Sequence, residues 1–220
     1  PRAVLERAQR PVRLQFVAGS QGVEYALVAH WRRAGLLADA PAEPRLPPVS
    51  QIAAVSGSCS PVTAGQIAHA RDNGFTPLRV EATRAVDAAA WASEIRRVTE
   101  AALDVLGQGG SPLAFSASGP DDPAVVALGE TVRAAGANAG DVNARIGAGL
   151  GAVLARILTT PGVRRAVVAG GDTSGEAVTA LGVYALSAAA AIATGAPLCR
   201  AYAQDARFLQ VPDGVRIDLQ

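Results

Sequence analysis

Short apolar runs alternate with helical patterns along most of this chain. The apolar runs, each typical of a buried strand, are residues 51–57, 76–82, 111–118 and 163–171. The stretches with apolar residues at helical spacing are residues 61–73, 88–106, 123–135, 141–159 and 174–181. Strands that alternate with helices are typical of a parallel sheet, because each helix carries the chain back to the start of the next strand. The sequence therefore predicts an α/β fold with a mostly parallel sheet and helices on both faces.

A proline-rich stretch precedes this alternating region. Residues 39–50 contain four prolines, and proline blocks the continuation of both helices and strand ladders. We interpret this stretch as a linker and residues 51–220 as the main domain. Residues 1–38 are then a separate N-terminal segment, in which we expect a strand at 14–20 and a helix at 21–37.

The C-terminal part of the chain is apolar and nearly uncharged. Residues 182–198 are rich in alanine, interrupted by Gly, Ser and Thr, and short for a membrane span. We predict a buried strand and a helix there, with further strands at 206–211 and 214–219. The apolar character of this third of the chain also favours a homodimer interface.

The composition excludes several classes of protein. Hydrophobic residues make up 50% of the 220-residue chain, enough to bury a core. Twenty basic residues, all arginine, are balanced by 19 acidic residues, and aromatic residues are only 4%. The chain therefore lacks the excess positive charge and the aromatic residues typical of nucleic-acid-binding proteins, and we expect no nucleic-acid partner. Two cysteines make no disulfide framework, so we expect a cytoplasmic protein with no membrane partner. The chain opens at Pro1 and has no Met, which we interpret as a trimmed segment of a longer protein.

The first candidate site is the sequence SGSCSP at residues 56–61, where a predicted strand ends and a helix begins. Free N–H groups at a helix start, together with hydroxyl side chains, suit an anion such as a phosphate. The candidate residues are Ser56, Gly57, Ser58 and Ser60. The alternative is an ordinary turn in which Ser60 caps the helix and Pro61 is its first residue.

The second candidate site is the sequence AGGDTSGE at residues 169–176, which also follows an apolar run and opens a helix. Its two adjacent glycines remove side chains where a ligand would meet the backbone. The candidate residues are Gly170, Gly171, Asp172, Thr173 and Ser174, with Asp172 as the ligand of Mg²⁺. The alternative is a capping box formed by Thr173 and Glu176, which needs no ligand. Two such turns in one sheet favour a shared phosphate site.

Three other features carry less weight. The sequence GAGLG at residues 147–151 lies inside a helical pattern, so close helix packing explains it; Gly149 would border a base or ribose only if a nucleotide lies nearby. Cys59 is a poor candidate nucleophile, because His69 lies roughly 14 Å further along the predicted helix by helical rise. The Walker A and protein-kinase signatures are absent from the sequence.

Two stretches, Ala53–Phe75 and Ala166–Val183, together resemble the C-terminal nucleotide-binding domain of the four-carbon acid sugar kinase family. The family includes 3-oxo-tetronate kinases and threonate or erythronate kinases. The resemblance covers about residues 50–220. It implies a two-domain, ATP-dependent kinase whose N-terminal domain holds the sugar acid, and residues 1–38 then resemble the tail of that domain.

The resemblance also implies roles for individual residues. By it, the residues that contact ATP are Ser58, Gly170, Gly171, Asp172 and Thr173. The family usually has Glu where this chain has Asp172, so the carboxylate here is one methylene closer to the backbone. The family's acidic D-D-x-T-G motif and its late glycine-rich motif with a lysine are not found in these 220 residues. The resemblance therefore places the catalytic residues outside this chain.

The sequence thus predicts the ATP-binding lobe of a kinase that phosphorylates a four-carbon sugar acid, with ATP and Mg²⁺ as cofactors. We expect the lobe to be inactive by itself. The alternative is a non-catalytic module or effector, derived from such a kinase, that binds a nucleotide or a phosphorylated metabolite. A hydrolase that uses Cys59 or Ser58 is disfavoured, because no base lies within reach in the motif.

Overall fold

The computed structural model describes residues 16–19, 21–38, 46–193, 196–203 and 215–219. The chain divides into two units, Pro1–Pro44 and Arg45–Gln220, and the division falls inside the proline-rich stretch. In the first unit, helix α2 spans Gln21–Arg33, so the helix expected at 21–37 is confirmed but ends four residues earlier. Residues 16–19 form neither helix nor strand, so the strand expected at 14–20 is wrong in its described part.

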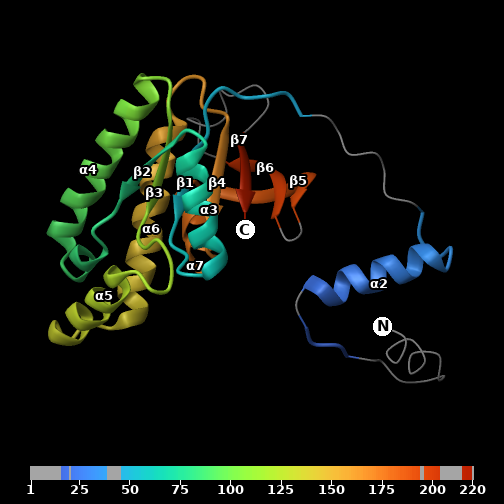
Figure 1. Ribbon diagram of the computed structural model, residues 1–220, viewed down its shortest axis with the longest axis horizontal. Coiled ribbons are helices and arrows are strands. Elements are labelled where there is room, and N and C mark those ends of the chain that lie inside the picture. Colours follow the sequence, from blue (N-terminus) through green and yellow to red (C-terminus); the bar gives the residue numbers. More distant parts are fainter. Residues whose placement is uncertain (1–15, 20, 39–45, 194–195, 204–214, 220) are drawn as a thin grey trace. The chain divides into compact units, whose positions relative to one another are not determined.

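The strands of the second unit form one seven-stranded sheet (Figure 1). They are β1 (Ala53–Ser56), β2 (Phe75–Arg79), β3 (Ser111–Phe115), β4 (Arg165–Ala169), β5 (Val183–Ala193), β6 (Ala196–Ala203) and β7 (Val215–Leu219). Their order across the sheet is β2-β3-β1-β4-β7-β6-β5. The neighbours from β2 to β7 pair in parallel, whereas β6 pairs antiparallel with both β7 and the edge strand β5. The predicted mostly parallel sheet is therefore confirmed.

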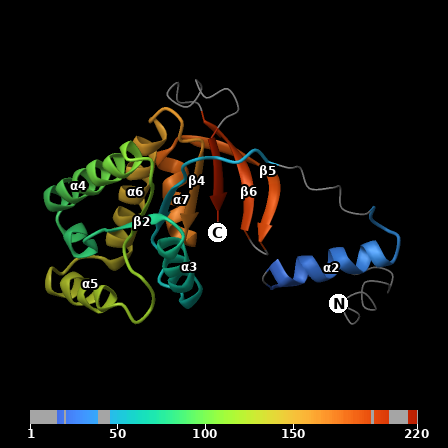
Figure 2. The same cartoon turned by 45° about the horizontal axis from the view of Figure 1, so that its top comes forward.

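Helices cover both faces of the sheet, as predicted (Figure 2). The helices of this unit are α3 (Pro61–Asp72), α4 (Ala88–Gly107), α5 (Pro123–Ala134), α6 (Ala139–Leu158) and α7 (Gly171–Ala180), with a 3₁₀ helix η1 at Ala82–Val86. Alternate residues of a strand point to opposite faces. Val55 accordingly packs into the large core that includes Leu150 of α6. Its neighbour Ala54 packs with Ile67 of α3 on the other face.

The chain leaves β1 and β4 in opposite directions. After β1 it passes through α3 to β2 at one edge of the sheet, and after β4 it passes through α7 towards β5 at the other edge. The two strands are nevertheless neighbours, with Ser56 in register with Ala169. In open α/β sheets, a point where helices leave adjacent strands on opposite faces is where a ligand crevice is expected, at the carboxyl ends of the strands. The two candidate motifs follow β1 and β4 directly, and we refer to the place where they meet as the crevice.

The C-terminal region corrects one prediction. Residues predicted as a strand and a helix form the antiparallel pair β5–β6 instead. Pairing with β6 has overridden the helix preference of the alanines, because such local preferences are weak against tertiary contacts. The strand is not buried either, since Tyr184, Leu186 and Ile192 are exposed. The strand expected at 214–219 is confirmed as β7, and the one at 206–211 lies outside the described residues.

Element boundaries also differ from the prediction, most clearly at β2 and α7. Strand β2 ends at Arg79, and η1 begins at Ala82, where the sequence suggested that the strand continued. Helix α7 begins at Gly171 rather than Ser174. Across the residues that the structure describes, no helix is long and apolar enough to cross a membrane. The association of two copies through the apolar C-terminal third stays a prediction.

Candidate functional site

The backbone segments of the two candidate motifs, residues 56–61 and 169–176, lie in close contact at the crevice. The N–H of Gly57 donates to the carbonyl of Ala169 at 3.0 Å. A Cβ added at Gly57 would collide with Oγ1 of Thr173, and one at Gly170 would lie 3.2 Å from the backbone nitrogen of Ser58. Gly170 also has a φ of +116°, a conformation that side chains disfavour. The structure therefore brings Gly57, Ser58, Gly170 and Thr173 together, and the close contacts require glycine at two of these positions.

Hydroxyl groups at the start of α3 form an ordered chain. Thr63 donates its hydroxyl proton to Oγ of Ser58 at 2.8 Å, and the N–H of Ser60 donates to the same oxygen at 3.3 Å. Because Thr63 has only one hydroxyl proton, Oγ of Ser60 must be the donor in its 2.9 Å contact with Thr63. Ser58 thus accepts two hydrogen bonds and keeps its own proton free to donate to a ligand.

The structure confirms the alternative interpretation of the first motif, in which Ser60 caps the helix. Ser60 is the N-cap of α3, with its Oγ accepting from the N–H of Thr63 at 3.1 Å, and Pro61 is the first helical residue. Capping does not use the proton of Ser58, so the cap and an anion site can coexist. Sequence reasoning missed the role of Thr63, which donates its hydroxyl proton to Ser58.

The start of α7 presents backbone N–H groups without a side-chain cap. Gly170 is the N-cap and has no side chain to accept from them. The first helical bond is donated by the N–H of Ser174 to the carbonyl of Gly170 at 2.8 Å, and Oγ of Ser174 donates to the same carbonyl. The N–H groups of the preceding residues of the helix have no acceptor within it. The capping box predicted from Thr173 and Glu176 is wrong, because Thr173 is the third residue of the helix rather than its cap.

Side chains at this helix start fit a ligand that carries its own cation. Gly171 is exposed, and a Cβ added there would have no atom within 4 Å. Asp172 is exposed beside it. Across the described ranges, no cluster of three or more His, Cys, Asp or Glu residues could hold a metal ion. A single carboxylate suits Mg²⁺ that also takes phosphate oxygens as ligands, which is how proteins commonly hold this ion.

Two of the predicted residues have separate environments. Gly149 is buried in α6, where an added Cβ would lie 2.5 Å from Cζ2 of Trp91 and 2.8 Å from Cδ1 of Ile95. Its contacts are therefore with α4, as expected from the helix-packing interpretation. Ser56 is 1% exposed, and its Oγ has no hydrogen-bond partner among the described residues.

Cys59 lacks the environment of a nucleophile. The thiol pKa is raised by burial and, to a smaller extent, by the negative charge of Asp122. A raised pKa disfavours the reactive thiolate at neutral pH. His69 contacts Asn73 on its own helix. These contacts agree with the expectation that Cys59 is a small polar turn residue.

A polar network that the sequence did not indicate lies at the carboxyl ends of β2 and β3. Asp122, the N-cap of α5, accepts hydrogen bonds from the Arg79 guanidinium at 2.8 Å and from the N–H and hydroxyl of Ser118 at 2.7 Å each. The Arg79 hydrogen bond is the main reason why the pKa of Asp122 is well below its usual range. The guanidinium also lies 5.0 Å from the centroid of the Phe115 ring. Asp122 and Arg79 are 43 residues apart, so no local pattern predicts their contact.

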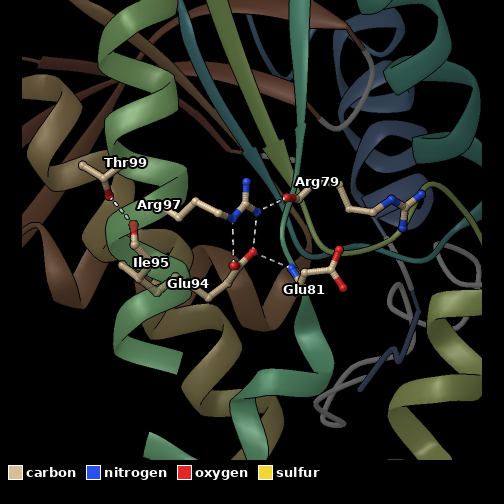
Figure 3. A network of polar contacts seen from close by, with 6 residues as sticks. All are labelled: Arg79, Glu81, Glu94, Ile95, Arg97 and Thr99. Carbon is tan, nitrogen blue, oxygen red and sulfur yellow. Dashed lines mark hydrogen bonds and ion pairs between the residues drawn. The ribbon is translucent and has the colours of Figure 1, made fainter. Parts of the chain in front are cut away.

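Helix α4 holds the backbone next to this network (Figure 3). The buried carboxylate of Glu94 accepts from the N–H of Glu81 at 2.8 Å and from Nε of Arg97 at 2.9 Å. Arg97 in turn donates to the carbonyl of Arg79 at 2.9 Å. The Arg97 hydrogen bond lowers the pKa of Glu94 despite its burial. The Glu94–Arg97 pair therefore fixes the backbone directly after Arg79, where β2 ends.

The fold defines the class of protein: an open, mostly parallel α/β sheet, a class in which ligands generally bind at the carboxyl ends of the strands. Residues 53–211 match the family described as the nucleotide-binding C-terminal domain. The chain therefore belongs to the four-carbon acid sugar kinase family, as its C-terminal nucleotide-binding domain.

Curated relatives of this chain carry kinase names. The chain is 47% identical over 205 residues to a 3-oxo-isoapionate kinase of Paraburkholderia graminis. This match covers 93% of the chain and 43% of the relative. It is 36% identical over 186 residues to a 3-oxo-tetronate kinase of Cupriavidus necator, covering 84% of this chain and 40% of the relative. The chain thus spans about two fifths of the length of these relatives.

Solved structures share the fold at low sequence identity. A Haemophilus influenzae protein matches 77% of this chain with a TM-score of 0.58 and 22% identity, over 36% of its own length. A Bordetella bronchiseptica domain of unknown function, solved with bound citrate as a domain-swapped dimer, matches the same share with a TM-score of 0.57 and 17% identity. That match covers 36% of the Bordetella chain. These similarities support the fold alone.

Proposed function

We propose that this chain binds Mg²⁺-ATP in the crevice between β1 and β4 and acts as the nucleotide lobe of a sugar-acid kinase. One observation carries the proposal. At the crevice, two glycines hold the backbone of both motifs in close contact, while the proton of Ser58 and the first N–H groups of α7 are left to donate. Donors from two helix starts around one point suit a polyphosphate.

Each residue has a role in holding the nucleotide. Ser58 donates its hydroxyl proton to a phosphate oxygen, and the N–H groups at the start of α7 donate to neighbouring oxygens. Gly171 leaves open the space in which a phosphate approaches the backbone. Asp172 orients Mg²⁺, either directly or through a water molecule. The Mg²⁺ ion would neutralise charge on the phosphates. Such electrostatic stabilisation, together with positioning, accounts for most of the catalysis of phosphoryl transfer.

The acceptor is proposed from the relatives' names. Both relatives are named as kinases of a 3-oxo acid, so we propose that the γ-phosphoryl group passes to a hydroxyl of a sugar acid of this type. A four-carbon acid remains the expectation from sequence. The base that accepts the hydroxyl proton, and the groups that hold the substrate carboxylate, would come from a second lobe outside these 220 residues. The isolated chain should then bind ATP without transferring phosphate.

A turnover assay tests this proposal. The 220-residue chain, and a longer protein that joins it to a sugar-acid-binding lobe, are each mixed with Mg²⁺-ATP and 3-oxo-tetronate, and ADP release is measured. We expect ADP release that depends on the sugar acid from the longer protein and none from the chain alone. If the longer protein binds ATP yet consumes none with any sugar acid offered, the non-catalytic binding module is the better description.

A further inference from the structure

Three arginines lie in one row across the C-terminal half of the sheet. Arg216 of β7 is in register with Arg165 of β4 on one side and with Arg200 of β6 on the other. Residues in register on neighbouring strands share a face of the sheet, and like charges placed in this way destabilise it. Neighbouring strands lie about 4.8 Å apart, so the backbone positions of the outer two arginines are about 10 Å apart. The row therefore concentrates positive charge within the span of a small molecule.

The arginine row lies on the α3 side of the sheet, in a part that α3 leaves uncovered. Arg165 is two residues before Val167, which packs with Ile67 of α3, so both strand residues belong to the same face. Ala166 and Val168, on the other face, are fully buried, whereas Arg165 and Val167 are half-buried. No described helix of the second unit lies over β5, β6 and β7 on the α3 side (Figure 1). This face is therefore open to a ligand.

The arginine row has no matching set of carboxylates. Across the strands β4 to β7, the acidic residue is Asp218, which is in register with Val167 and Leu198 rather than with an arginine. Neither Arg165 nor Arg200 forms an ion pair among the described residues. The row therefore keeps an excess of positive charge, which an external anion would neutralise.

Hydrogen-bond donors surround both outer arginines. The guanidinium of Arg165 is held in place by a 3.1 Å hydrogen bond to the carbonyl of Pro47. Its Nε is buried and has no partner among the described residues, so water screens this charge less than it would an exposed one. Ser187 is in register with Arg200, and its hydroxyl lies 3.2 Å from that of Tyr202. Since one hydroxyl proton forms that contact, the other is free to donate to an anion.

We propose that the arginine row binds a small oxyanion with two or more negative charges, such as a polycarboxylate or a phosphate. Arginine suits these ligands because its guanidinium can donate two parallel hydrogen bonds to a carboxylate or a phosphate. Arg165 is the first residue of β4 and Ala169, at the crevice, is the last. About 13 Å of strand separates the two places. The row is therefore a second site, and it does not depend on the nucleotide proposal.

Calorimetric titration of the 220-residue chain with two probes tests the proposal. Tricarballylate supplies carboxylates and inorganic phosphate supplies a phosphate, and both are used at low ionic strength without Mg²⁺. Arg200→Gln removes one charge of the row. Arg133→Gln is the matched control, because Arg133 is exposed on α5. Gly171→Val reports any anion that is held at the crevice instead.

We expect saturable binding of at least one probe by the parent and a Kd about tenfold or more higher for Arg200→Gln. Arg133→Gln and Gly171→Val should bind that probe like the parent. The probe that binds more tightly distinguishes a carboxylate ligand from a phosphate ligand. No binding by the parent, equal binding by the two arginine variants, or a loss confined to Gly171→Val would each overturn the proposal.

Urea unfolding without either anion provides a second test. Arg200→Gln relieves repulsion between like charges in register, so its free energy of unfolding should equal or exceed that of the parent. A free energy of unfolding clearly below that of Arg133→Gln would show that Arg200 is satisfied within the fold, and it would also overturn the proposed site.

Discussion

Thr63 donates its hydroxyl proton to Ser58 across one turn at the start of α3. Because Ser60 must then donate to Thr63, the three hydroxyls form a chain with a single direction, and the proton at its end belongs to Ser58. Thr63 is buried. In the proposed site it would therefore be a positioning residue, which orients the Ser58 donor without itself touching the phosphate.

Replacing Thr63 with Val should weaken nucleotide binding. The variant keeps the shape of the side chain but removes the donor that orients Ser58, so the proton of Ser58 can turn away from the ligand. We expect the Kd for Mg²⁺-ATP to rise about three- to tenfold, the scale of one oriented hydrogen bond. Calorimetric titration measures the change. Ser60→Ala is the informative comparison, because it should also lower the stability of α3 by about 1 kcal/mol through loss of the N-cap.

Gly57→Ala should destabilise the fold through its contact with Thr173. The new Cβ would meet Oγ1 of Thr173, and forced overpacking costs about 1–3 kcal/mol. Urea unfolding of the single variants and of the double variant Gly57→Ala/Thr173→Ala gives the coupling between the two sites. We expect Thr173→Ala to recover part of the loss. Additive effects in the double variant would argue against the contact.

A substitution at Gly149 tests whether this glycine serves helix packing or nucleotide binding. Gly149→Ala places a methyl group against Trp91, so the unfolding free energy should fall by about 1–3 kcal/mol. The affinity of the folded protein for Mg²⁺-ATP should stay unchanged, because α4 rather than the crevice contacts this position. The two quantities are measured by urea unfolding and by titration well below the unfolding transition. A selective loss of ATP affinity with unchanged stability would assign Gly149 to the nucleotide site.

The Asp122 carboxylate should make the fold sensitive to acid. Its pKa is lowered in the folded state, chiefly by Arg79. The stabilisation is therefore complete above the ordinary Asp pKa of 3.8 and is lost as the pH falls below that value. Asp122→Asn should cost about 2 kcal/mol at pH 7, because it removes a charged hydrogen bond. The difference between the variant and the parent should shrink as the pH falls below 3.8.

The neighbouring Asp121 supplies the control for that experiment. It is exposed, so Asp121→Asn should leave the unfolding free energy nearly unchanged from pH 7 down into the acid range. Chemical unfolding at a series of pH values measures both variants. A gap between Asp122→Asn and the parent that stays constant into strong acid would contradict the role assigned to the Arg79 contact.

The sequence predicted the central strands because their apolar runs are buried on both faces. Val55 and Ala54 point in opposite directions and both lie in a core, which produces a continuous apolar run rather than alternation. The start of α3 was also predictable, since Ser60 and Pro61 are residues typical of a cap and a first helical position. The carboxyl-end location of both motifs followed from these elements.

Other features depend on contacts that no local pattern records. The early start of α7 rests on the positive φ of Gly170, which the sequence cannot specify for one glycine among several. The β5–β6 pair depends on partners across the sheet. The direction of the hydroxyl chain depends on the side-chain conformation of Thr63, and the contact of Arg79 with Asp122 depends on the order of the strands. These features arise from tertiary structure, which is why the sequence alone did not predict them.

Calorimetric titration with Mg²⁺-ATP tests the central claim most directly, with two glycines of α7 as a matched pair. An added Cβ has no atom within 4 Å at either Gly171 or Gly175, so the protein should accommodate valine at both positions. Only Gly171 lies at the first turn beside the crevice. The account predicts saturable binding by the parent and by Gly175→Val, and affinity at least about tenfold weaker for Gly171→Val. Equal binding by the two variants, or no binding by the parent, would contradict it.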